Sequence, residues 1–145
     1  FTMDVGAVSG GYCSDMTRPV AVGNVSEKQK MVYNTVLKAQ TEALKAIKAG
    51  AVCKDIDAVS RNIIYSAGFE GCFGHGLGHS VGLEIHESPA FNTSDETVLK
   101  SGTVITVEPG IYLENEFGVR IEDMVLVTQN GILNLTESSK ELIIL

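Results

Sequence analysis

The chain has 145 residues, of which 44% are hydrophobic and 20% charged, and its formal net charge is −7 at pH 7. This length and composition are typical of one soluble globular domain with its own core. The acidic balance argues against binding to the phosphate backbone of nucleic acids, and no apolar run is long enough to cross a bilayer. We therefore expect no nucleic-acid partner and no membrane insertion.

The three cysteines predict a reducing compartment. Cys13, Cys53 and Cys72 form no CxxC pair, and their odd number does not indicate a disulfide framework. We expect free thiols and a cytoplasmic location.

The first residues predict a β-hairpin. Phe1–Val8 alternates like a strand, Gly10-Gly11 has turn composition, and Tyr12–Val22 reads as the second strand. The chain begins inside this strand-like pattern, from which we expect a processed, excised or truncated piece of a longer protein.

Two amphipathic helices are predicted next. Ser26 is a candidate N-cap for a helix over Glu27–Ala49, with Gly50 at the C′ position, and Asp55–Ala67 forms a second helix that Gly68 ends. The expected inward positions are Val32, Val36, Ala39, Ala43 and Ile47 in the first helix and Ile56, Val59, Ile63 and Ile64 in the second.

The last third is rich in strand patterns, whereas the segment 71–87 has no clear period and 92–100 is polar and loop-like. Strands are expected at Thr103–Val107, Ile111–Leu113, Gly118–Thr128 and Ile132–Leu135. The order of strands, two helices and strands predicts an α+β fold, with residues 1–145 in one domain.

All the histidines of the chain lie within twelve positions. His75, His79 and His86 are interleaved with glycines, and histidine is the commonest metal ligand and the side chain that titrates near neutral pH. A single histidine is usually structural or merely exposed, but this clustering predicts a functional site.

Four carboxylates stand in strand-like contexts. They are Asp4, Asp15, Glu108 and Glu122. A carboxylate at the core end of an apolar strand is costly unless it is paired or bound to a cation. Each one alone could be a turn cap or an ion-pair partner, for example Glu122 with Arg120, but together with the histidines they favour a metal site.

Five ordered segments carry a family resemblance over the whole chain: MDVGA, GYCSDMTR, HGLGHSVGLEIHE, VEPGIY and GVRIEDM. They resemble the pita-bread metallopeptidases, in the branch of the Xaa-Pro aminopeptidases and Xaa-Pro dipeptidases (prolidases). The resemblance implies a pita-bread fold that is incomplete at its N-terminal side. His75, four residues ahead of His79, and the VRIED context of Glu122 fit this branch better than the methionine aminopeptidases.

The resemblance also implies a site for two divalent metal ions. Asp15 and Glu122 would bridge the metals, Asp4 would chelate one of them, and His79 with Glu108 would complete the other. Manganese is the expected metal, and cobalt, zinc or iron would suit the same ligands.

The implied reaction is hydrolysis of the N-terminal Xaa-Pro bond by a water that bridges the metals. His86 would stabilise the developing charge, and His75 would line the substrate pocket. Glu108 would double as proton acceptor, and Arg120 would hold a ligand carboxylate.

The implied partner is a peptide with proline at its second position, and a homo-oligomer is expected. The implied domain is longer than this chain, so we expect weak or no activity from residues 1–145 alone. The alternatives are a non-catalytic pita-bread binding module, a methionine aminopeptidase, and metal-free creatinase-type hydrolysis.

Overall fold

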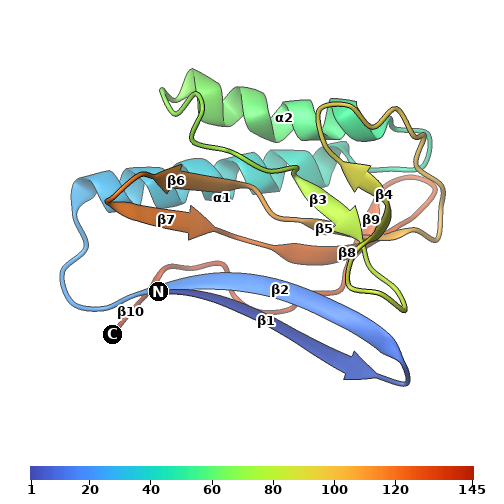
Figure 1. Cartoon of the computed structure of the whole chain (residues 1–145), viewed down its shortest axis with the longest axis horizontal. Coiled ribbons are helices and arrows are strands. Elements are labelled where there is room, and N and C mark those ends of the chain that lie inside the picture. The colour runs from blue at the N-terminus through green and yellow to red at the C-terminus, as the bar shows by residue number, and fades with distance from the viewer.

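The computed structural model describes residues 1–145 and has three antiparallel or mixed sheets and two helices. Figure 1 shows the helices as one layer over the strands of the C-terminal half, with the N-terminal hairpin on the opposite side. The elements in chain order are β1 (Thr2–Ser9), β2 (Tyr12–Ala21), α1 (Glu27–Ala46), α2 (Cys53–Ser66), β3 (Gly78–Ser80), β4 (Glu87–Phe91), β5 (Val104–Val107), β6 (Gly110–Leu113), β7 (Phe117–Arg120), β8 (Asp123–Val127), β9 (Ile132–Asn134) and β10 (Ile143–Ile144).

The strand order explains how distant segments meet. The largest sheet has the order β4-β3-β5-β8-β9, the hairpin sheet has the order β1-β2-β10, and β6 pairs with β7. The pairing of β10 with β2 is parallel and brings the two ends of the chain close together (Figure 1). The hairpin joins the rest through Thr17, which forms an isolated bridge with Glu122. The predicted α+β class is thus confirmed.

The first helix follows its predicted stripe but ends early. Ser26 forms a capping box with Gln29, and all five predicted inward residues are at most 1% exposed. The predicted end at Ala49 with Gly50 as C′ residue is wrong. Ile47 is extended, and the amides of Ala49 and Gly50 donate to Thr128 and Leu99 in other segments. Gly50 has a positive φ in this turn instead.

The second helix begins at Cys53, two residues before the prediction, and ends at Ser66. Gly68 follows with φ of 89°, as expected of a residue that ends a helix. Ile56 and Ile64 are buried, whereas Val59 and Ile63 are only half-buried. Neither helix combines the length and the apolar character of a bilayer-crossing segment.

The long strand predicted for Gly118–Thr128 is two strands. β7 ends at Arg120 and β8 begins at Asp123, because the amide of Glu122 donates to the carbonyl of Thr17 on the hairpin. This break turns the chain from one sheet to another at the position of a candidate ligand. The segment 71–87, which shows no period, contains the short strand β3.

A buried polar network lies behind this break. Asp123 is fully buried and forms ion pairs of 2.6 Å with both Arg18 and Lys140, and it also accepts a hydrogen bond from Asn134. Burial alone would raise the pKa of Asp123, but the hydrogen bonds from Lys140, Arg18 and Asn134 hold it below its usual value. The network therefore keeps a charged carboxylate inside the fold.

Asp123→Ala is expected to lower the free energy of unfolding by about 3–5 kcal/mol, because it leaves the charge of buried Arg18 uncompensated. Urea denaturation measures this loss. The matched control is Glu116→Ala, which removes an exposed ion pair with Lys28 and should cost less than about 1 kcal/mol. Equal losses in the two variants would contradict the role assigned to the network.

Candidate metal centre

The candidate ligands come from both halves of the chain. Asp4 lies on β1 and Asp15 on β2, whereas His79 lies on β3. Glu108 directly follows β5 and Glu122 directly precedes β8. Since β3, β5 and β8 are neighbours in one sheet and the hairpin docks at Glu122, the topology brings these residues to one place.

Three of the predicted ligands form a compact cluster. Donor atoms of Asp15, His79 and Glu122 all lie within 4.8 Å of one another. His79 Nε2 is 3.3 Å from Glu108 Oε1 and 3.7 Å from Asp15 Oδ2. Asp4 is more exposed, yet its charge lies near enough to raise the pKa of Asp15, an effect second to that of burial. The structure thus brings Asp15, His79 and Glu122 together, with Glu108 next to His79 and Asp4 at the edge of the group.

Glu122 is the most buried member, with 1% of its surface exposed. Its Oε2 accepts a hydrogen bond of 2.5 Å from the Thr17 hydroxyl, but its Oε1 has no partner. Burial, with the nearby charge of Glu108, raises the pKa of Glu122 to about 8. An unpartnered carboxylate oxygen aimed among other carboxylates and an imidazole fits a divalent cation, which would supply the missing positive charge.

The imidazole of His79 is oriented by its neighbours. Its Nδ1 lies 3.2 Å from the carbonyl oxygen of Ser80, to which it can only donate, so in the neutral ring Nε2 carries the lone pair and can bind a cation. Burial opposes protonation, but the hydrogen bond with Glu108, assisted by Ser80 and Asp15, raises the pKa of His79 overall. The Thr106 hydroxyl donates to Glu108 Oε1 and accepts from the His79 amide, so it links two candidate ligands.

One glycine is required for this arrangement. A Cβ at Gly78 would lie 2.0 Å from the carbonyl oxygen of Thr106. Any side chain there would push β3 away from β5 and move His79 away from Glu108.

Arg120 connects the cluster to the hairpin. Its guanidinium donates to Asp4 Oδ2 at 2.5 Å, to the Thr17 hydroxyl at 3.1 Å and to the Tyr112 hydroxyl at 3.3 Å. Burial would lower the pKa of Arg120, but its bond with Tyr112 and the charges of Asp4 and Glu108 raise it. Arg120, which is predicted to hold a ligand carboxylate, thus donates to Asp4, one of the predicted ligands.

The two remaining histidines lie on the wall of a cavity of about 350 Å³, together with His79, Glu108 and Arg120. The ring of His86 is exposed, and its centroid is 4.2 Å from that of His79. His75 Nε2 lies 2.9 Å from the Tyr112 hydroxyl. The cavity therefore joins two of the candidate ligands, His79 and Glu108, to both residues predicted to contact substrate.

Several residues that build this site were not among the predicted site residues. Tyr112 links His75 to Arg120, and Thr17 links Glu122 to Arg120. Arg61 pairs with Asp57 on α2 and donates to the carbonyls of Phe73 and His75, which fixes the loop before β3. Tyr112 and Thr17 stand inside the motif segments VEPGIY and GYCSDMTR, which is the signal that could have found them, whereas Arg61 stands outside all five segments.

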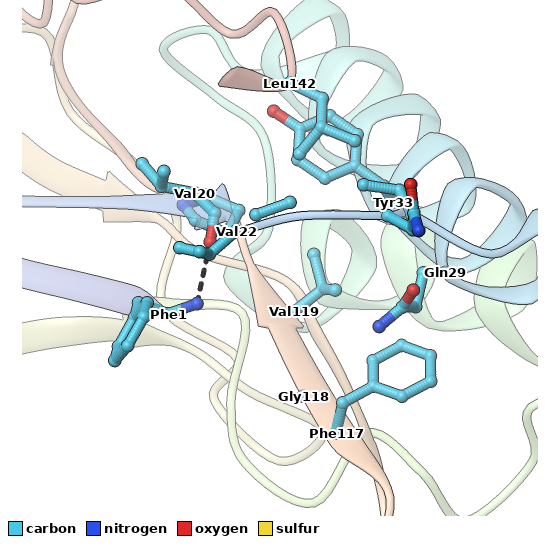
Figure 2. Close-up of a pocket in the computed structure, with 13 residues that line it drawn as sticks. Phe1, Val20, Val22, Gln29, Tyr33, Phe117, Gly118, Val119 and Leu142 are labelled. Atoms are coloured by element: carbon cyan, nitrogen blue, oxygen red, sulfur yellow. Dashed lines mark hydrogen bonds between the residues drawn. The ribbon is translucent and has the colours of Figure 1, made fainter. Parts of the chain in front are cut away.

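A second hollow, of about 270 Å³, has a different character. Figure 2 shows it beside Phe1, between the end of β2, the start of α1 and β7. Nine of its thirteen lining residues are hydrophobic, and none is a predicted ligand or catalytic residue. This hollow is not the candidate reaction centre.

Saturating Mn²⁺ is expected to stabilise the chain against urea, by about 2.7 kcal/mol at one hundred times the dissociation constant. Glu122→Gln should abolish the gain, because it replaces the buried unpartnered oxygen with a neutral amide. The comparison is with the same protein in EDTA, and Glu116→Gln is the surface control. A gain that survives in Glu122→Gln would place the cation elsewhere.

A family model described as metallopeptidase family M24 matches residues 1–129. A Xaa-Pro dipeptidase of Pyrococcus horikoshii is 50% identical over 141 residues, which are 97% of this chain and 40% of that protein. The chain spans about two fifths of the length of the curated relatives it matches.

Solved structures of Xaa-Pro peptidases are similar to this chain along nearly its whole length. A Xaa-Pro dipeptidase from Bacillus anthracis superposes with a TM-score of 0.98 at 50% identity, over 99% of this chain and 41% of that one. An X-Pro aminopeptidase from Thermotoga maritima MSB8 gives a TM-score of 0.97 at 43% identity, over 99% and 40% of the two chains. With the family match over most of its length and this agreement in structure, the chain belongs to metallopeptidase family M24 and has its pita-bread fold.

Proposed function

We propose that the protein containing this chain hydrolyses the peptide bond between an N-terminal residue and proline, and that it uses two divalent cations. The observation that carries the proposal is the cluster of Asp15, His79 and Glu122, whose donor atoms converge beside the cavity. Relatives named Xaa-Pro dipeptidase and X-Pro aminopeptidase support the substrate class.

The proposed ligands are Asp4, Asp15, His79, Glu108 and Glu122. Two dications would balance the four carboxylate charges, which repel one another in the bare chain. Oxygen-rich ligands with one imidazole suit Mn²⁺, our first choice, as well as Co²⁺, Zn²⁺ or Fe²⁺. When bound, the cations would polarise the scissile carbonyl and lower the pKa of the attacking water.

The protein's own groups supply the remaining chemistry. Glu108 would accept the proton of the attacking water, because its carboxylate lies both at the cluster and on the cavity wall. His86 would donate a hydrogen bond to the oxygen on which negative charge develops. Arg120 would hold Asp4, and His75, oriented by Tyr112, would contact the substrate.

The proposal concerns the whole protein. Because the chain spans only about two fifths of its relatives, we propose that residues 1–145 supply the metal centre, while efficient cleavage needs the rest of the domain. Cleavage of dipeptides or of longer peptides, a homo-oligomeric state and a cytoplasmic location stay predictions.

The test is an assay of the intact protein with Ala-Pro, Ala-Pro-Ala and Met-Ala peptides. Cleavage of a proline substrate that EDTA abolishes and Mn²⁺ restores is the expected result. Preference for Met-Ala would indicate a methionine aminopeptidase, and no cleavage with metal bound would indicate a binding module.

His86→Ala is expected to lower kcat by about 10²–10³, the typical cost of losing one donor to a developing oxyanion. Its metal content, measured by elemental analysis, should be unchanged, since His86 is not among the proposed ligands. Leu83→Ala, an exposed residue of the same loop, is the control and should retain activity. Loss of metal in His86→Ala would instead assign the residue to the metal centre.

A further inference from the structure

We propose that Arg18 is a positioning residue that sets the spacing of the two carboxylates Asp15 and Glu122, and that the segment 138–140 holds Arg18 in place. The inference rests on the proposed metal centre. It concerns Arg18, which ends the motif segment GYCSDMTR but is not a predicted site residue, and a C-terminal segment that lies outside all five motif segments.

The two carboxylates are carried by different sheets. Asp15 lies on β2, in the hairpin sheet, and Glu122 directly precedes β8 of the large sheet. The backbone link between these sheets beside the cluster is the bridge of Thr17 with Glu122, in which the Glu122 amide donates to the Thr17 carbonyl at 3.1 Å. The hairpin also contacts the loop before β4, where the Cys13 amide donates to the Gly82 carbonyl, and it contacts β7 through the pair of Asp4 and Arg120. The bridge beside the two carboxylates nevertheless consists of a single backbone pair, whose geometry depends on the side chains around it.

Arg18 fixes the bridge itself. Its NH1 donates to the backbone carbonyls of both Thr17, at 2.9 Å, and Glu122, at 2.5 Å, so one nitrogen holds both sides of the bridge. Its NH2 donates to Asp123 Oδ1 at 2.6 Å. The planar guanidinium with its fixed donors therefore defines the geometry between the two sheets.

The C-terminal segment holds Arg18 from the other side. Arg18 donates from Nε to the carbonyl of Ser139 and from NH2 to that of Ser138. Lys140 then reaches back to Asp123 at 2.6 Å and to Gln40 of α1 at 3.0 Å, and its carbonyl accepts from the Tyr33 hydroxyl. Figure 1 shows this red segment returning from β9 between β8 and β2 to its end at β10.

The charge of Arg18 is balanced without engaging the carboxylate of Glu122. Arg18 reaches the backbone carbonyl of Glu122 and not its carboxylate, and its charge is balanced by Asp123, which is fully buried. Glu122 Oε1 consequently has no partner and stays available to a cation. Arg120 differs, because it binds the ligand carboxylate of Asp4 directly.

The first test is the affinity of the chain for Mn²⁺ alone, measured by isothermal titration calorimetry. Arg18→Lys keeps the positive charge but loses the fork, and we expect the dissociation constant to rise about 10–100-fold, the usual effect of outer contacts to metal ligands. Lys140→Met, at a partly exposed position, should weaken Mn²⁺ binding in the lower part of that range. The variant Lys140→Met takes the place of Arg18→Lys in this test if Arg18→Lys does not fold.

Ile64→Ala is the control for a merely structural effect. Ile64 is a buried residue of α2, which packs on α1 and β4 away from the bridge. This variant should lose stability yet bind Mn²⁺ as the unaltered chain does. Equal weakening in Ile64→Ala and Arg18→Lys would overturn the proposal.

The second test needs no metal. Hydrogen exchange of the Glu122 amide in EDTA reports on the bridge itself, and Arg18→Lys should speed that exchange while amides of α1 keep their protection. Loss of protection spread equally over the chain, or none at Glu122, would refute the inference. If the unaltered chain binds no Mn²⁺, the proposed metal centre fails, and the exchange experiment still decides the role of Arg18.

Discussion

The structure depends on one electrostatic constraint: several carboxylates are held together at the junction of two sheets. Glu122 shows its strength, since burial and the charge of Glu108 raise its pKa to about 8 and one of its oxygens lacks a partner. The hydroxyl of Thr17 and the guanidinium of Arg120 offset only part of this repulsion. A site built in this way stores unfavourable energy that a divalent cation would release on binding.

Two arginines, Arg120 and Arg18, stabilise this junction from opposite sides. Arg120 lies on the cavity side and contacts a ligand, whereas Arg18 lies on the buried side and contacts backbone. Both share Thr17, the first through its hydroxyl and the second through its carbonyl. The hairpin is therefore fixed from two directions at the residue where it meets the larger sheet.

Local sequence predicted much of the fold. The stripe of α1 and the capping residue Ser26 depend on contacts within a few turns, and both were correct. The end of α1 and the break at Glu122 could not be predicted, because each is set by backbone hydrogen bonds to segments far along the chain. The proposed ligands stand in ordered motifs. Tyr112 stands in one of the same segments, but its contact with His75 could not be predicted from it, and Arg61 acts through partners that no local pattern reveals.

The free edge of β1 has a further consequence. This strand pairs with β2 on one side only, and it exposes Met3, Val5 and Val8. Such an edge is a template for a strand from another polypeptide. The same strand carries Asp4, a proposed metal ligand. A strand that paired there and shifted Asp4 would change cation affinity, and cation binding would then change the pairing by the same factor.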